Sequence, residues 1–309
     1  MKLSPVRGLG LELPHASAGK LYFGTANDVG YFNDIRYITF LDDSTEVGQI
    51  TPENSQKFDA TEPQRGVFNF ANAERVVIHA LTQGQKVRCH NLVWHNGLPG
   101  WLTSGSWDRP TLLVIMENHI KNVVRHFRGR CYTWDVVNEA FNDDESYRET
   151  TWYNIIGAEY IPIAYQLTAK YDPAARLYYN DYGIESVNNK SIAAANLIKE
   201  LLGQGVRVDG VGLQAHFPTI QLPDYESQMA SLQQFTNLGV EVAYSELDVY
   251  FDTLRACLDT PRCVGITVWK SFRCALLGLA AIPGFRDPCL WDITYTKKDV
   301  YHGIEKMLE

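Results

Sequence analysis

Eight short runs of apolar, β-branched and aromatic residues limit what this chain can fold into more than any other feature. Most runs are followed by a stretch with helical periodicity. Several runs are almost continuously apolar, which is typical of strands buried on both faces of a parallel sheet. The expected strands are 21–25, 48–51, 86–93, 132–137, 177–180, 210–214, 240–247 and 264–269. The expected helices are 71–82, 111–127, 152–171, 188–202, 225–238 and 299–308.

Strands that alternate with helices indicate the α/β class, and eight such units predict a (β/α)₈ TIM barrel. The 309 residues fit one barrel of about 250 residues with modest insertions. Because no Gly/Ser/Pro-rich linker divides the chain, residues 1–309 are expected to form a single catalytic domain. Residues 1–18 are expected to be an N-terminal lead-in, and no separate carbohydrate-binding module is expected.

Charge and hydropathy exclude several classes of partner. The formal net charge is −8 and no long basic run occurs, so binding to nucleic acid or to an anionic membrane surface is not expected. No stretch reaches the roughly 18 apolar residues of a membrane span. Ser4 and Pro5 stand where a signal peptide would need its apolar run, so none is expected in this chain. With no exposed heptad pattern, a monomer is expected.

Polar and aromatic side chains gather at the carboxyl ends of the expected strands, where TIM-barrel active sites lie. Capping alone would need only Asp, Ser and Asn. Carboxylates, imidazoles and indoles from many strands therefore indicate a functional rim. Its members are Glu53, Asn54, Lys57, His90, Trp94, His95, Asn138, Glu139, Asn180, Asp181, Gln214, His216, Glu246, Asp248 and Trp269.

Two carboxylates of this rim, Glu139 and Glu246, follow the fourth and seventh expected strands and should face each other across the barrel mouth. Cleavage of a glycosidic bond uses such a pair: one carboxylic acid protonates the leaving oxygen and one carboxylate attacks the anomeric carbon. No phosphate-binding loop or Gly-x-Ser-x-Gly elbow supports another chemistry. Neither a metal ion nor an organic cofactor is expected.

Six stretches resemble glycoside hydrolase family ten, whose members are chiefly endo-β-1,4-xylanases, and the similarity is to fungal members. The stretches are 48–57 (GQITPENSQK), 87–95 (VRCHNLVWH), 132–140 (YTWDVVNEA), 212–216 (GLQAH), 245–248 (SELD) and 265–269 (GITVW). This resemblance implies a TIM barrel that hydrolyses xylan internally by a retaining double displacement. It also implies an extracellular enzyme.

The resemblance also implies roles for individual residues. Glu139 matches the acid/base of the family and Glu246 its nucleophile. Asn138 matches the residue that hydrogen-bonds the 2-hydroxyl of the attacked sugar, while Gln214 and His216 match the pair that orients the nucleophile and the glycon. Six more residues match side chains that line the sugar sites: His90 and Trp94 at the point of cleavage, Trp269 beneath that sugar, and Glu53, Asn54 and Lys57 at the next sugar outward.

Two cysteine pairs are candidate disulfides. Cys257 and Cys263 bracket a short turn that a disulfide can close if the Cα atoms lie within about 7 Å, although buried thiols are the alternative. These two residues match a bridged pair in the family. Cys89 and Cys131 resemble a second pair found in some fungal members.

Three segments depart from the family pattern. Gly97 stands where the family has a glutamine that binds the attacked sugar. Residues 249–264 leave room for only a short outer helix, so the barrel wall there is expected to be poorly covered. Residues 270–281 have the family's length but different residues, which suggests a compensated reading-frame shift in the gene or its sequence.

Two alternative functions stay open. One is a catalytically weakened xylan-binding barrel. The other is a retaining β-glycosidase acting on another β-linked glycan or a plant glycoside, since a fold does not fix the substrate.

Overall fold

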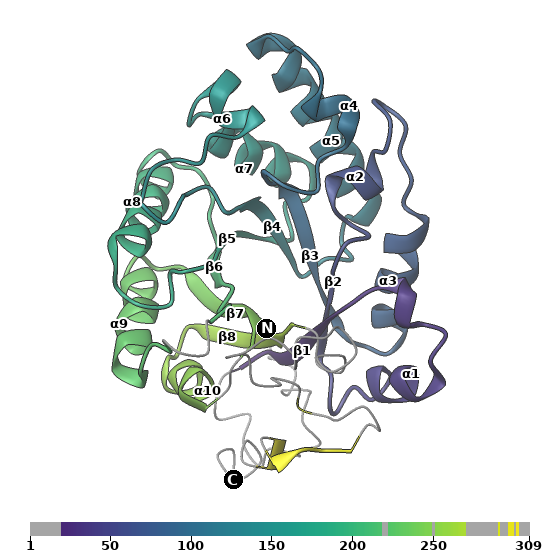
Figure 1. Cartoon of the computed structure of the whole chain (residues 1–309), viewed down its shortest axis with the longest axis vertical. Coiled ribbons are helices and arrows are strands. Elements are labelled where there is room, and N and C mark those ends of the chain that lie inside the picture. Colours follow the sequence, from purple (N-terminus) through teal and green to yellow (C-terminus); the bar gives the residue numbers. More distant parts are fainter. Residues whose placement is uncertain are drawn as a thin grey trace.

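The computed structural model describes residues 20–217, 222–248, 251–269, 290, 296–299 and 301–302. Eight parallel strands close into a barrel in which each strand pairs with the next and β8 pairs with β1 (Figure 1). The strands are β1 Tyr22–Asn27, β2 Gln49–Pro52, β3 Lys86–Val93, β4 Thr133–Asn138, β5 Arg176–Asp181, β6 Gly210–Leu213, β7 Glu241–Leu247 and β8 Cys263–Val268. The predicted (β/α)₈ fold is therefore confirmed.

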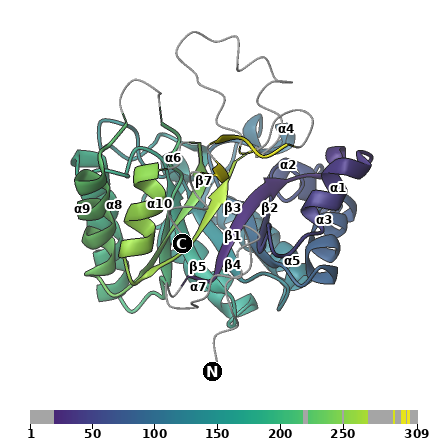
Figure 2. The same ribbon diagram turned by 90° about the horizontal axis from the view of Figure 1, so that it is seen from below.

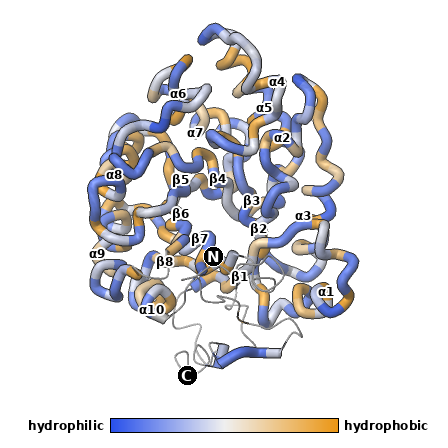
Figure 3. The backbone as a smooth tube through the Cα atoms, in the orientation of Figure 1, coloured by the Kyte–Doolittle hydropathy of each residue, from blue (hydrophilic) through white to orange (hydrophobic). Residues whose placement is uncertain are grey.

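Helices surround the barrel on its outside, as the side view makes plain (Figure 2). They are η2 Val29–Tyr31, α1 Ile35–Leu41, α2 Phe58–Thr61, α3 Ala71–Thr82, α4 Gly100–Thr103, α5 Arg109–Phe127, α6 Thr151–Ile156, α7 Tyr160–Tyr171, α8 Asn189–Gly203, α9 Tyr225–Thr236 and α10 Phe251–Asp259. Hydrophobic and hydrophilic segments alternate along the longer helices (Figure 3), as expected for helices with one face on the barrel. Within the described ranges, no helix has the length and apolarity needed to cross a membrane.

The expected elements match the observed ones with small shifts at their ends. The expected helix 152–171 is instead two helices, because Gly157 ends α6 with a φ of 80° that favours glycine. The short helices α1, α2 and α4 were not predicted, since they are too brief to show a helical period. The expected helix 299–308 lies largely outside the described residues.

The barrel interior is filled by large polar side chains as well as apolar ones. Arg88 and Asp135 form a buried ion pair there, and the Arg88 guanidinium also packs over the ring of Tyr178. A Cβ atom at Gly212 would collide with Asn180 and Arg88, so glycine at this position leaves the space that these side chains occupy. Through Asn180, which contacts both Arg88 and Glu246, the polar interior of the barrel is connected to the polar site at its mouth.

Both expected disulfides are present. Cys89 on β3 is joined to Cys131, just before β4, and Cys257 on α10 is joined to Cys263 at the start of β8. The helix α10 is short, as predicted, but the expectation of a poorly covered wall is wrong. The residues of β8 are buried, and α10 packs against both β8 and α9, so even this short helix is enough to cover the strand.

Candidate active site

A cavity of about 360 Å³ opens at the carboxyl ends of the strands. Its lining residues come from segments spread over most of the described chain, which the closed barrel brings to one place. They are Lys57, His90, Trp94, Asn138, Glu139, Tyr182, Gln214, His216, Glu246 and Trp269. Nine of the eleven residues expected to act on or bind the substrate are in this lining. Glu53 and Asn54, which are not, lie close to Lys57.

Glu246, near the end of β7, is 6% exposed and is held at both carboxylate oxygens. Its Oε1 accepts a hydrogen bond from Asn180 Nδ2 at 3.0 Å, and its Oε2 lies 3.0 Å from His216 Nε2. Burial by itself raises the pKa of Glu246, but the hydrogen bond from His216, with further contributions from His90 and Asn180, outweighs it and leaves the pKa below its ordinary value. Glu246 is therefore an ionised carboxylate.

His216 connects Glu246 to a second carboxylate. Its Nδ1 lies 2.8 Å from Asp248 Oδ2 while its Nε2 faces Glu246. Burial lowers the pKa of His216, but the hydrogen bonds to Asp248 and Glu246 dominate and raise it to about 10. The imidazole is therefore protonated at neutral pH, and both of its ring nitrogens donate.

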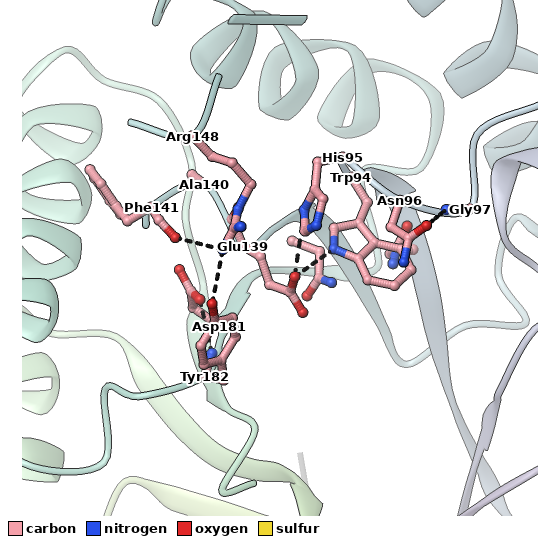
Figure 4. Close-up of polar contacts among 12 residues, drawn as sticks. Trp94, His95, Asn96, Gly97, Glu139, Ala140, Phe141, Arg148, Asp181 and Tyr182 are labelled. Carbon is pink, nitrogen blue, oxygen red and sulfur yellow. Dashed lines mark hydrogen bonds and ion pairs between the residues drawn. The ribbon is translucent and has the colours of Figure 1, made fainter. Parts of the chain in front are cut away.

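Glu139, directly after β4, points into the cavity towards indole and imidazole groups (Figure 4). Trp94 Nε1 donates to Glu139 Oε2 at 2.8 Å, and Gln214 Nε2 donates to Glu139 Oε1 at 3.0 Å. His95 Nδ1 lies 3.5 Å from Glu139 Oε2. Burial lowers the pKa of His95, which favours its neutral form. The partners of Glu139 are thus mainly neutral donors.

The backbone at Glu139 has a φ of 55°, which non-glycine residues rarely adopt. Arg148 holds this conformation from outside the cavity: its Nε donates to the carbonyl of Glu139 at 3.2 Å, and its Nη2 donates to the Phe141 carbonyl and to the Tyr182 hydroxyl (Figure 4). The Glu139 N–H donates to the carbonyl of Asn180 at 2.8 Å. These contacts direct the carboxylate into the cavity.

A chain of amides joins the two carboxylates. Asn180 Nδ2 lies 2.8 Å from the amide of Asn138 as well as 3.0 Å from Glu246. Gln214 Nε2 lies 3.3 Å from the same Asn138 amide while it donates to Glu139. Glu139 and Glu246 therefore belong to one hydrogen-bonded cluster.

The cluster is anchored in the barrel interior. Asn180 Oδ1 accepts from Ser245 Oγ at 2.6 Å and from Arg88 Nη2 at 3.3 Å, so its Nδ2 is directed towards Glu246. Asp135, the ion-pair partner of Arg88, also lies 2.9 Å from His90 Nδ1. The deep ion pair thus orients side chains on both sides of the cavity.

Lys57 contacts two neighbours in the site, Trp94 and Asn54. Lys57 Nζ lies over the ring of Trp94, 5.0 Å from its centre, and donates to Asn54 Oδ1 at 2.8 Å. Burial lowers the pKa of Lys57, whereas the charge of Glu246 acts in the opposite direction. The ring of Trp269 lies edge-on to those of His90 and His216, at centre distances of 6.0 and 6.4 Å.

The departure at Gly97 has a local explanation. Gly97 has a φ of 60°, and a Cβ atom there would lie 3.3 Å from the side chain of Lys57. The Asn96 side chain accepts from the Gly97 N–H at 2.9 Å and so does not reach Glu139 (Figure 4). No side chain at this position replaces the absent glutamine. The unusual segment 270–281 lies outside the described residues, so the reading-frame hypothesis stays a prediction.

Sequence reasoning gave no role to several residues that build the site. Asn180 and Asp248 belong to the expected rim, yet only the folded structure shows which carboxylate each one serves. Tyr182 directly follows the end of β5, and this position is the signal from which its place in the site could have been predicted. Arg148 lies in a long connection after β4, where no spacing rule points to it.

Comparison with known proteins identifies the family of this chain. Residues 11–307 match the family model described as glycosyl hydrolase family 10. The chain is 43% identical over 305 residues to endo-1,4-beta-xylanase D of Talaromyces funiculosus, covering 93% of this chain and 75% of that protein. It is 42% identical over 304 residues to an endo-1,4-beta-xylanase of Agaricus bisporus, covering 93% and 91%.

Solved structures of xylanases are also similar to this chain. A GH10 xylanase from Bispora sp. MEY-1 with xylobiose has a TM-score of 0.91 at 36% identity, covering 97% of this chain and 99% of that one. Xylanase 10B from Thermotoga maritima has a TM-score of 0.90 at 36% identity, covering 97% and 98%. On the strength of the match over nearly its whole length, the chain belongs to glycosyl hydrolase family 10.

Proposed function

We propose that this protein is an endo-1,4-β-xylanase that cleaves xylan with retention of anomeric configuration, Glu246 acting as nucleophile and Glu139 as acid/base. The observation that carries the proposal is the pairing of two carboxylates in one cavity with unlike partners. Glu246 contacts a protonated imidazole, whereas Glu139 contacts an indole N–H and an amide. Such a difference favours ionisation of one member of the pair over the other.

In the first step, Glu246 attacks the anomeric carbon while Glu139 transfers its proton to the glycosidic oxygen. The bond from the anomeric carbon to that oxygen breaks, the aglycone leaves as an alcohol, and a glycosyl ester forms on Glu246. In this proposal the amide of Asn138, which lines the cavity, binds the 2-hydroxyl of the attacked sugar.

In the second step, Glu139 accepts a proton from a water molecule, and the resulting hydroxide attacks the anomeric carbon from the side that the aglycone left. The ester bond to Glu246 breaks and the carboxylate is regenerated beside His216. Two inversions at the same carbon give overall retention.

The relatives and the chain itself support the proposed substrate, xylan, and the proposed location outside the cell. Fungal relatives at 42–43% identity are endo-1,4-beta-xylanases, and the structure of the Bispora relative was solved with xylobiose. Lys57 lies over the ring of Trp94 in the cavity lining, and in this proposal Trp94 contacts the sugar at the point of cleavage while Lys57 contacts the next sugar outward. Disulfides persist in oxidising compartments, which supports action outside the cell. We further propose one catalytic domain that acts as a monomer.

Three alanine variants test the assignment of the carboxylates. Glu139→Ala and Glu246→Ala should each lose xylan hydrolysis by a factor of about 10³ or more, whereas Glu149→Ala, at an exposed position nearby, should be unaffected. An aryl β-xylobioside with a good leaving group needs no acid to depart. Glu139→Ala should therefore still release the aryl group in a burst, and Glu246→Ala should not. Wild-type rates in either site variant would end that assignment.

A second candidate function is a weakened barrel that binds xylan without cleaving it, which the missing side chain at Gly97 favours. Calorimetric binding of xylohexaose by the folded wild-type protein, with no products by mass spectrometry, would decide for this candidate. Mass analysis of digests of xylan, of mixed-linkage glucan and of an aryl plant glycoside separates xylanase action from action on another β-linked substrate.

A further inference from the structure

Ala215 occupies a backbone position that touches both halves of the site. It lies between Gln214, which donates to Glu139, and His216, which pairs with Glu246. Its φ is 60°, in the left-handed region that an alanine rarely adopts. The side chain of Ala215 is fully buried. A change at this one residue would therefore move the donors of both carboxylates together.

A buried carboxyl group holds this turn. Glu185, in the connection after β5, is 3% exposed, and its Oε1 accepts the N–H of Ala215 at 2.7 Å. On the other side of the turn, the carbonyl of Ala215 accepts the N–H of Asp248 at 3.4 Å. The Gln214 N–H donates to the carbonyl of Asp181 at 2.9 Å. The shortest of these contacts is the one from Glu185.

We propose that Glu185 is a positioning residue for hydrolysis, which fixes the left-handed turn at Ala215 and thereby aims Gln214 at Glu139 and His216 at Glu246. The proposal rests on the proposed roles of those two carboxylates. Glu185 itself is absent from the cavity lining, so in this proposal it acts through the backbone of Ala215.

The surroundings of Glu185 favour its uncharged form. Burial raises the pKa of Glu185 and the charge of Asp181 adds to this, whereas the hydrogen bond from Ala215 and the charge of His216 oppose it; the resulting pKa is about 7. The phenol of Tyr244 also interacts with Glu185, and its hydroxyl donates to Gln228. What the turn needs from Glu185 is thus an oxygen that accepts a hydrogen bond, which a glutamine at the same position also supplies.

Two substitutions at position 185 distinguish the effect of losing the hydrogen-bond acceptor from the effect of changing the side chain. Glu185→Leu leaves the buried Ala215 N–H without a partner, so the turn relaxes and kcat on an aryl β-xylobioside should fall about tenfold to a hundredfold. The acid limb of its kcat/KM profile should move to higher pH, because Glu246 loses part of the stabilisation that His216 provides. Glu185→Gln, which keeps an acceptor oxygen, should have the wild-type kcat and the acid limb at its wild-type pH.

A third variant tests the turn itself. Glycine adopts a positive φ without the steric cost that alanine bears, so Glu185→Leu with Ala215→Gly should recover much of the lost rate. Ser231→Ala is the matched control, because it removes a buried hydrogen bond to the carbonyl of Ile184, next to Glu185, without touching the turn. This control should lower stability and leave the pH limbs in place.

The proposal also has a readout that needs no turnover. In protein labelled with ¹³C at the glutamate carboxyl carbons, the NMR titration of Glu246 should show a higher pKa in Glu185→Leu than in wild type or Glu185→Gln. If wild type proves inactive on xylan, the function proposed above fails and this titration still decides the positioning role. A folded Glu185→Leu variant with the wild-type pKa of Glu246 and unmoved pH limbs would overturn the proposal.

Discussion

At the scale of single residues, the site shows how two identical side chains acquire different properties. Glu139 and Glu246 line one cavity, but His216 pairs with Glu246 whereas Trp94 and Gln214 donate to Glu139. A cationic donor stabilises an anion more strongly than a neutral donor does. The difference therefore lies in the neighbours, which come from the segments directly after β3 and β6.

A prediction at this scale concerns the titration of Glu185. Its native pKa is about 7, compared with an ordinary value of 4.5, so the native state binds more protons than the unfolded state between those values. The free energy of unfolding therefore falls as pH rises through this window, by at most about 3 kcal/mol from this group. Glu185→Gln removes the titration, so its stability relative to wild type should increase by up to that amount from pH 4.5 to pH 8.

Urea denaturation at the two pH values measures this change. Glu226→Gln on the exposed surface of α9 is the control and should show no comparable pH dependence. An equal stability difference between Glu185→Gln and wild type at both pH values would contradict the titration.

At the scale of elements, local sequence accounts for where most strands and helices lie. The strand Lys86–Val93 and the helix Ala71–Thr82 have the expected bounds, because the hydrophobic period of each segment is clear and stops clearly at both ends. The sequence predicts one helix over 152–171 because a helical period runs on both sides of Gly157. In the structure, the backbone at that glycine separates α6 from α7. The coverage of β8 by α10 depends on packing against α9, which a residue count does not show.

The two disulfides give a prediction at the element scale. Cys257 and Cys263 close a loop with a sequence separation of 6, whereas Cys89 and Cys131 close one with a separation of 42. Because a longer loop loses more entropy in the unfolded chain when it is closed, removing the bridges should cost about 2 and about 4 kcal/mol respectively. Denaturation of the Cys257→Ser/Cys263→Ser and Cys89→Ser/Cys131→Ser variants tests the order. A larger loss from the short loop would contradict it.

At the scale of the whole molecule, barrel closure places residues from distant segments within hydrogen-bonding distance. Arg88 on β3 reaches Asp135 on β4 and Asn180 on β5, and Asn180 in turn reaches Glu246 on β7. The interior ion pair is thus connected to the site at the mouth. Both side chains of the pair are only 1% exposed, so the closed barrel encloses it completely.

A prediction at this scale concerns that pair. Arg88→Met leaves Asp135 buried beside His90 without its guanidinium partner, so the free energy of unfolding should fall by about 3–5 kcal/mol. Arg88→Met combined with Asp135→Leu should cost less than the two single changes together, because no lone charge then remains buried. Guanidinium denaturation of the four proteins measures the coupling. Strict additivity would show that the pair contributes no interaction of its own.

The sequence by itself determined the barrel class, the eight strands and nine residues of the cavity lining. Strand periodicity is local, and the carboxyl ends of parallel strands always share one edge. Only the tertiary structure decided which donors each glutamate receives, that Arg148 supports the backbone of Glu139, and that Glu185 holds Ala215. Those contacts join residues distant in the chain, and their geometry depends on side-chain rotamers and positive φ angles that arise when the barrel closes.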